Sequence, residues 1–179
     1  METFANFDKV SFKNVLVFKD EFTIPLRNQG VISVIGINKD TGGSNGAGKS
    51  TIFDILRAIH LGKVADGTPD IQFLSNKGSS YINYVASYGK NTYDITKYRN
   101  DKVYKNNTIV LKNGKPIGAK KNAVALRKEI SENYIKLSEA VFDNCVVLRT
   151  DKAHTLLQGT PTERIDFIFC NLYISWLRP

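Results

Sequence analysis

The stretch Gly43-Ser44-Asn45-Gly46-Ala47-Gly48-Lys49-Ser50 fits the pattern G-x-x-x-x-G-K-[ST] at every position. Glycines in such a loop let successive backbone N–H groups approach phosphate oxygens with no Cβ in the way. The lysine of the pattern binds β- and γ-phosphate oxygens, and the hydroxyl after it ligates Mg²⁺. We therefore predict a nucleotide-binding loop with Lys49 on the terminal phosphates, Ser50 on the metal and Thr51 on the α-phosphate.

The segments on either side of this loop favour the same interpretation. Residues 30–36 are a short apolar run bounded by glycines, which predicts a buried central strand. From Lys49 to Leu61 apolar residues recur at helical spacing, and Gly62 can end that helix. The positive end of the helix dipole then faces the loop. In this context a chance glycine turn is the minor alternative, at roughly one in twenty.

The rest of the chain reads mostly as strands and short helices. Strands are expected at 9–18 and 21–26 and in two hairpins, one turning at Gly89 and the other at Asn113-Gly114. The hairpins predict a small antiparallel sheet at about 81–118. Helices are expected at 120–134 and 138–144, a strand at 145–148 and a further helix from Pro161.

The excess of positive charge is confined to one segment. The chain has 25 basic and 17 acidic residues, a net charge of +8. Between residues 97 and 128 there are ten basic residues and one acidic residue, Asp101. Such a concentration indicates a surface for a phosphate backbone, although a solvated face kept for solubility is an equally weighted reading of the charges alone. The DNA-binding candidates are Lys97, Arg99, Lys102, Lys105, Lys112, Lys115, Lys120 and Lys121.

Several classes of protein are disfavoured. The chain has no run of eighteen apolar residues and no basic and apolar start typical of a secretory signal, so we expect a cytoplasmic protein without membrane contact. Its cysteines, Cys145 and Cys170, are too few for a disulfide framework. With His60 and His154 they form no metal-ligand spacing.

The acidic pair that hydrolysis requires is not found after the loop. One carboxylate of such a pair holds Mg²⁺ and another orients water, at the end of a hydrophobic strand. Downstream of Thr51 no four-residue apolar run is followed by Asp-Glu or Asp-Asp. The similar string at 15–21 precedes the loop and contains Lys19, so we interpret it as a turn between the first two strands. The sequence predicts binding without complete machinery for turnover.

The ordered set of motifs resembles a known family. The loop, in the form G-x-N-G-x-G-K-S, together with Phe12-Lys13-Asn14 is similar to the ATP-binding heads of SMC-like ABC ATPases of DNA repair. The nearest likeness is to the large subunit of phage recombination endonucleases and to the bacterial SbcC proteins. It extends through the strand at 93–99, the Asn113-Gly114 turn, Phe142 and residues 160–164, and reaches about residue 172.

This resemblance implies an α/β P-loop NTPase fold, with a mixed central sheet and an antiparallel β subdomain. Heads of this family bind ATP and Mg²⁺ in an N-terminal lobe and continue through a coiled coil to a C-terminal lobe that carries the signature motif and the acidic pair. Two heads sandwich two ATP molecules and act with a nuclease on DNA ends. Residues 1–179 resemble the first lobe only, so we expect a single lobe.

Three positions depart from the family pattern. Residues 37–42 lengthen the link between strand and loop. Arg149-Thr150-Asp151 stands where the family has a Mg²⁺-sensing glutamine, which puts sensing of the γ-phosphate in doubt. Leu16 replaces an arginine that contacts nucleotide, so it is given no such role.

The apolar residues at the end of the chain must be buried against something. Residues 165–179 are apolar around most of a helix and lack the charged heptads that enter a coiled coil. Either a partner such as a complementary lobe packs on them, or the chain is a truncated product, whereas burial against its own domain could cover one face only. The alternatives to a repair ATPase lobe are a non-enzymatic half-head that docks on another repair ATPase, and an unrelated small NTPase that completes its site with other residues.

Overall fold

A computed structural model describes residues 5–39, 41–44, 46–63, 77–118, 123–135, 137, 139, 142–147, 160–162 and 164. Its contacts divide the chain into two compact units, Met1–Ile135 and Lys136–Pro179. Each unit is described by itself, and the expectation of a single lobe over 1–179 stays a prediction. None of the described helices is long and apolar enough to cross a bilayer.

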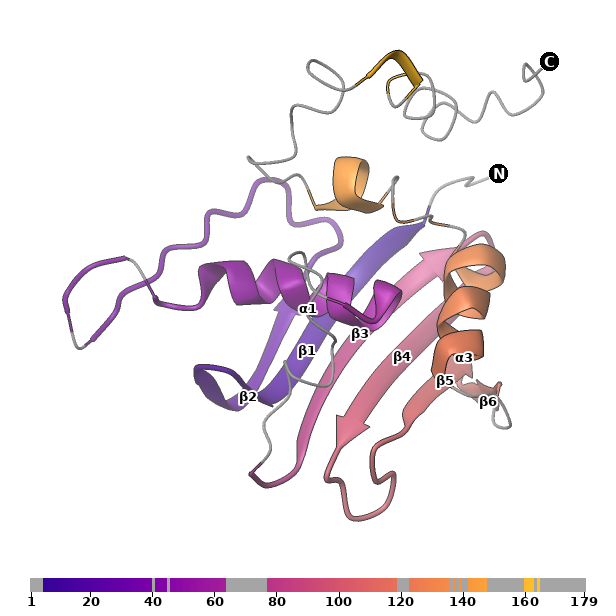
Figure 1. Ribbon diagram of the computed structural model, residues 1–179, viewed down its shortest axis with the longest axis horizontal. Coiled ribbons are helices and arrows are strands. Elements are labelled where there is room, and N and C mark those ends of the chain that lie inside the picture. The colour runs from indigo at the N-terminus through magenta and orange to yellow at the C-terminus, as the bar shows by residue number, and fades with distance from the viewer. Residues whose placement is uncertain are drawn as a thin grey trace. The chain divides into compact units, whose positions relative to one another are not determined.

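The first unit is built on one six-stranded sheet (Figure 1). The strand order is β2-β1-β3-β4-β5-β6, and every neighbouring pair is antiparallel. The strands are β1 (Asn6–Val15), β2 (Phe18–Pro25), β3 (Ser80–Tyr88), β4 (Asn91–Arg99), β5 (Thr108–Lys112) and β6 (Lys115–Ile117). All the predicted strands before residue 27 and after residue 80 are therefore confirmed, up to residue 117.

The sheet differs from the predicted arrangement in one respect. We expected a mixed central sheet and a separate antiparallel subdomain, but β1 pairs with β2 on one side and with β3 on the other. The early strands and the later hairpins are thus one antiparallel sheet among the described residues. Because β1 pairs along both edges, its backbone N–H and C=O groups are hydrogen-bonded on both sides. In two separate sheets the backbone groups along one edge of β1 would be unpaired.

The turns follow from local sequence. Asn113 and Gly114, between β5 and β6, have φ values of 49° and 77°, the positive pair that a tight hairpin turn with the right twist needs. Between β1 and β2 the turn is only Leu16 and Val17, and Leu16 has a φ of 48°. Residues 18–21 of the string interpreted as a turn already belong to β2.

One face of the sheet forms the core. Val10, Phe12, Ile82, Tyr84 and Ile95 are all at most 1% exposed, and the strand registers place them on the same face. Helix α1 (Lys49–Leu61) crosses this face and contacts β1, β3 and β4.

Helix α1 confirms the predicted span at both ends. Ile55 and Ile59 are buried toward the sheet, and His60, which is fully buried, lies with its Nδ1 3.2 Å from the Tyr84 hydroxyl. The helix ends where Gly62, with a φ of 75°, donates its N–H to the Ala58 carbonyl at 2.9 Å. Left-handed glycine is the usual stop at this position.

A second helical segment covers the other part of the same face. Helix α3 (Ala123–Glu129) runs into a π-helical turn, η1 (Ile130–Tyr134), so the helix predicted at 120–134 is confirmed from residue 123. Tyr134 of η1 stacks on Tyr93 of β4, with ring centroids 5.4 Å apart. Ile130 is fully buried, which anchors η1 in the core.

The strand predicted at 30–36 is wrong. Residues 32–38 are extended but pair with no described strand, and Val31 and Ile35 are 100% and 81% exposed. A buried strand of this composition requires partner strands on both sides. The six described strands pair among themselves, so none supplies that ladder to residues 30–36.

In the second unit, the strand predicted at 145–148 is also wrong for the residues that are described. Phe142–Val146 forms a π-helical turn, η2, and the Val147 N–H donates to the Phe142 carbonyl at 3.0 Å. No strand is described in this unit, so a strand here would lack a ladder, whereas the turn pairs its own backbone groups. The helix expected at 138–144 is confirmed where it is described, because Glu139 is α-helical and Phe142–Val146 forms η2.

The helix predicted from Pro161 is confirmed at its start. Pro161, Thr162 and Arg164 are helical, and the Arg164 N–H donates to the Thr160 carbonyl at 3.0 Å. Residues 165–179 lie outside the described residues, as do Arg149-Thr150-Asp151 and the candidates Lys120 and Lys121.

Candidate nucleotide site

The glycine-rich loop ends on the first residue of α1. Gly46 and Gly48 have φ values of 74° and 79°, which glycine adopts without steric cost. Among the described residues, the N–H groups of Gly46, Ala47 and Gly48 donate no hydrogen bond. These amides and the first turn of α1 therefore form a set of donors at the positive end of the helix, which suits a phosphate.

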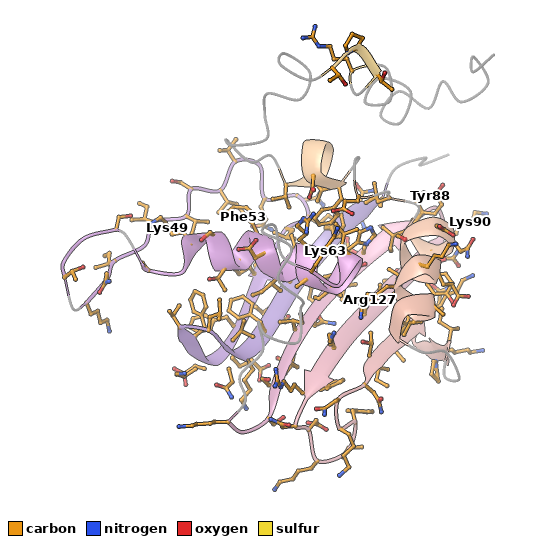
Figure 2. The ribbon with its side chains drawn as sticks, viewed as in Figure 1. Lys49, Phe53, Lys63, Tyr88, Lys90 and Arg127 are labelled. Atoms are coloured by element: carbon orange, nitrogen blue, oxygen red, sulfur yellow. The ribbon has the colours of Figure 1, made fainter. Side chains whose placement is uncertain are left out.

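Lys49 lies across the loop. Its Nζ donates to the Ser44 carbonyl and lies 2.6 Å from the Ser44 Oγ. Figure 2 shows Lys49 at the beginning of α1, on the side of the loop. An ammonium held by a neutral carbonyl and a hydroxyl can exchange these weak acceptors for phosphate oxygens, which bind it more strongly. The structure thus brings two of the predicted site residues, Ser44 and Lys49, into contact.

The next two residues differ in exposure. Ser50 is exposed, so its hydroxyl is accessible to a metal ion. Thr51 is only 6% exposed, and its N–H donates to the Gly48 carbonyl at 3.1 Å. Contact of the Thr51 side chain with an α-phosphate stays a prediction, and Asn45 lies outside the described residues.

Residues 37–42, which lengthen the link to the loop, close back on themselves. The Asn38 N–H donates to the Gly43 carbonyl, and its own carbonyl accepts from Gly42, both at 2.8 Å. The Asn38 Oδ1 also accepts the Thr41 N–H at 3.3 Å. The two ends of the insertion are therefore held together, so the extra residues need not displace the loop.

Gly36 is a site residue that the sequence indicated only as a boundary. A Cβ at this position would lie 2.7 Å from the Ala47 Cβ and 2.9 Å from the Lys49 Cγ. Only glycine allows the extended segment to approach the loop this closely. The signal in the sequence was a glycine at the end of an apolar run, which is also typical of an ordinary strand boundary.

The turn between β1 and β2 supports the loop from another side. A Cβ on Gly48 would lie 2.7 Å from the Val17 Cγ2 and 2.9 Å from the Phe18 Cε2. Phe18 is fixed in turn by edge contacts with Phe12 and Phe22, at ring-centroid distances of 5.1 and 5.3 Å. This contact joins residues 31 positions apart, and no local pattern in the sequence predicts it.

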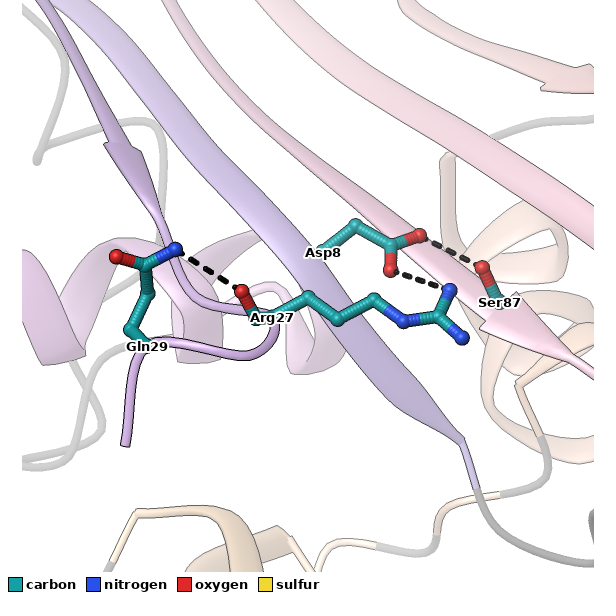
Figure 3. Close-up of polar contacts among 4 residues, drawn as sticks. All are labelled: Asp8, Arg27, Gln29 and Ser87. Atoms are coloured by element: carbon teal, nitrogen blue, oxygen red, sulfur yellow. Dashed lines mark hydrogen bonds and ion pairs between the residues drawn. The ribbon is translucent and has the colours of Figure 1, made fainter. Parts of the chain in front are cut away.

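A polar cluster holds the chain where it leaves the sheet toward the loop (Figure 3). The Arg27 Nη1 donates to the Asp8 Oδ1 at 3.1 Å, and the Ser87 hydroxyl donates to the Asp8 Oδ2 at 2.6 Å. The Leu26 and Arg27 N–H groups both donate to the Asp8 carbonyl. Three segments are thus tied together at Asp8, so the segment that leads to the loop starts from a fixed point.

The basic candidates do not form one surface. Lys102 and Lys105 are exposed in the loop after β4, next to Arg99, which is half-buried. Lys112 and Lys115 are cross-strand neighbours at the β5–β6 hairpin, where the Lys112 Nζ lies 5.9 Å from the Tyr93 ring centroid. Since Tyr93 pairs with Lys112 and Lys97 with Thr108, the two groups are about 13 Å apart along β4.

Lys97 itself is only 7% exposed, on the core face of β4 beside Ile95. It is therefore not placed to meet a partner at the surface. The role of the whole set in binding DNA stays a prediction.

The loop and its place at the start of a helix define the class of protein. A glycine-rich loop with unused amides, a lysine folded over it and a hydroxyl next to the lysine is the phosphate-binding site of the P-loop NTPases. A family model described as an AAA domain matches residues 9–169, and the chain belongs to this family of nucleotide-binding ATPase domains. Comparison with curated proteins finds none that matches this chain.

The residues present fit the cofactors that this family implies. The free amides of Gly46, Ala47 and Gly48, with Lys49, would hold the phosphates of ATP, and Ser50 would supply one oxygen ligand to Mg²⁺. Bound Mg²⁺ neutralises phosphate charge. No group of three or more acidic, histidine or cysteine side chains is placed to hold a metal within the described part of the chain.

Proposed function

We propose that the chain is the ATP- and Mg²⁺-binding N-terminal lobe of a phage-type, SMC-like recombination and repair ATPase that acts with a nuclease subunit on DNA ends. The observation that carries this proposal is the loop at 43–50, where, among the described residues, the N–H groups of Gly46, Ala47 and Gly48 are unpaired and Lys49 is bound only to Ser44. The family match and the resemblance of the ordered motifs support the more specific assignment.

The exposed apolar residues of the segment before the loop support the proposal that a partner lobe binds there. Val31, Ile35 and Ile37 are 100%, 81% and 74% exposed, although runs of such residues are typical of strands buried on both faces. A complementary C-terminal lobe, or a second head, would supply the strands that cover them. The same lobe would bring the acidic pair, because the sequence after Thr51 lacks one.

Nucleotide binding is tested by titrating a fluorescent ATP analogue with Mg²⁺. We expect Lys49→Ala to abolish saturable binding, because the variant loses the cation that meets the terminal phosphates. Lys63→Ala, which removes a lysine beyond the other end of α1, is the matched control and should bind as the wild type does. Equal affinity of wild type and Lys49→Ala would refute the nucleotide site.

Hydrolysis is tested separately. The isolated chain should turn over ATP negligibly, because no water-positioning carboxylate is identified. Steady-state hydrolysis at about 1–10 per second, lost in Lys49→Ala, would show that the chain carries a complete site. Addition of a complementary lobe should be required for turnover.

A role of the basic segment in DNA contact predicts a steep dependence on salt. A protein that neutralises six phosphates loses roughly a thousandfold in affinity between 50 and 200 mM salt. Duplex binding that is flat across this range would refute the DNA role and leave the nucleotide site untouched.

The exposed segment also favours a second function, a non-enzymatic half-head that docks on another repair ATPase. Pull-down from an extract, with and without ATP, separates the two. A docking module captures a complete head, whereas an N-terminal lobe captures its complementary lobe. Recovery of a complete head would therefore replace the first proposal.

A further inference from the structure

The face of the sheet opposite α1 carries a row of tyrosines. Helices α1 and η1 contact the core face, through Tyr84 and Tyr93 respectively. On the other face the registers align Lys13, Tyr81 and Tyr98 across β1, β3 and β4. Both tyrosines are half-buried, and their rings lie 6.1 Å apart.

A third tyrosine extends this row beyond the sheet. Tyr104, in the loop between β4 and β5, stacks on Tyr98 with ring centroids 4.6 Å apart and planes at 25°. Tyr104 is 42% exposed, so part of its ring faces solvent. We call Tyr81, Tyr98 and Tyr104 the tyrosine row. Figure 1 shows the loop that carries Tyr104 at the lower end of the sheet.

The loop holds Tyr104 in a defined position. The Asp101 Oδ1 accepts the N–H groups of Val103 and Tyr104, each at 2.9 Å, and the Ser79 hydroxyl donates to its Oδ2 at 3.2 Å. The backbones of Asp101 and Lys105 exchange two hydrogen bonds of 3.1 Å. Those amide hydrogen bonds lower the pKa of Asp101, so the carboxylate stays charged while it fixes the loop. A ring that is already ordered loses little entropy on stacking.

Lysines flank the Tyr104 end of the tyrosine row, whereas at its other end Tyr81 donates a hydrogen bond to the Glu21 carboxylate, the cross-strand partner of Lys13. Lys13, Lys102 and Lys105 are exposed, and the single acidic group of the loop, Asp101, is engaged by the loop itself. Burial raises the pKa of Tyr98, so its ring remains a neutral phenol that does not repel an anion. Aromatic rings beside lysines are the arrangement with which proteins bind single strands, because bases stack on the rings and phosphates meet the cations.

We propose that the tyrosine row, with Lys13, Lys102 and Lys105, is a binding site for single-stranded DNA on which at least one base stacks against Tyr104. The proposal rests on the DNA role given above, and it assigns single-stranded DNA as the form of DNA that binds at this end of the sheet. It separates Lys102 and Lys105 from Lys112 and Lys115, which lie at the other end of β5. Duplex DNA keeps its bases paired and cannot offer a ring face there, except at an end.

The test is fluorescence anisotropy of the full chain with a labelled oligothymidine of about 12 nucleotides, within the usual site size. Tyr104→Ala should weaken binding by about tenfold, the scale of one lost stacking contact. Tyr104→Phe keeps the ring and should bind as the wild type does. Lys90→Ala removes an exposed lysine from the turn between β3 and β4, at the other end of the sheet, and is the control for charge.

Each arm gives a decisive result. A duplex with blunt, capped ends should bind Tyr104→Ala and the wild type equally. Wild-type affinity of Tyr104→Ala for oligothymidine would overturn the proposal, as would an equal loss on the duplex. Equal or tighter binding of oligouridine would overturn the assignment to DNA. A flat salt dependence on the duplex, with the Tyr104 effect retained on the single strand, would refute only the duplex role of the basic segment.

Discussion

Replacement of Gly48 by alanine tests how the turn between β1 and β2 supports the phosphate loop. Gly48 has a φ of 79°, a region that costs an L-residue about 1–2 kcal/mol. The new Cβ would also lie 2.7 Å from the Val17 Cγ2, well inside the optimal carbon–carbon separation of about 3.5–4.0 Å. Overpacking of this kind adds about 1–3 kcal/mol. Gly48→Ala should therefore lower the free energy of unfolding by roughly 2–5 kcal/mol.

Gly42→Ala separates the two contributions. Gly42 has a similar φ of 70°, but a Cβ there meets no atom within 4 Å. This variant should lose only the backbone cost of about 1–2 kcal/mol in urea denaturation. A double variant, Gly48→Ala with Val17→Ala, should recover about 1 kcal/mol relative to the sum of the single changes. Equal costs for Gly48→Ala and Gly42→Ala, or no coupling with Val17, would refute the proposed contact.

Two further predictions concern the helical half of the core. Gly62→Ala places a Cβ on the flexible end of the Arg127 side chain, which can move aside, whereas Gly114→Ala, at a similar φ of 77°, meets no atom; we therefore expect both variants to lose only the backbone cost of about 1–2 kcal/mol in urea unfolding. A clearly less stable Gly62→Ala would show that Arg127 cannot move aside. Burial raises the pKa of Tyr134 to about 12 from 10.0 in the unfolded chain, so the folded state favours the neutral phenol. Its contribution to stability is complete below pH 10 and is lost between about pH 10 and pH 12, and Tyr134→Phe should flatten the fall in thermal midpoint over this range.

The sequence predicts correctly the elements whose structure depends on residues close together in the chain. The helix at 49–61 could be predicted to the residue because its apolar spacing and Gly62 act within one turn of the chain. The hairpin at Asn113-Gly114 follows from two residues that tolerate positive φ. The phosphate loop was recognised for the same reason, since its chemistry lies in eight consecutive residues.

The errors concern features that depend on distant partners. The composition of residues 30–36 suits a buried strand, but a strand exists only if other strands pair with it, and a sequence does not show whether they are present. The contact of Val17 with Gly48 and the anchoring of Arg27 by Asp8 join segments that are separated by tens of residues or by a β-strand. The basic segment is continuous along the chain, whereas the sheet places its members at two ends.

The position of the exposed segment links the proposed partner to the nucleotide. Residues 31–37 precede the insertion that rejoins the loop at Gly43, and Gly36 lies against Ala47 and Lys49, so a lobe that pairs with this segment fixes one wall of the phosphate site. Ordering of that wall by the lobe leaves less entropy for the nucleotide to lose. Because such coupling is reciprocal, the factor by which the lobe tightens ATP binding must equal the factor by which ATP tightens docking of the lobe. ATP affinity that stays the same with and without the lobe would mean that the lobe does not order the segment at 31–37.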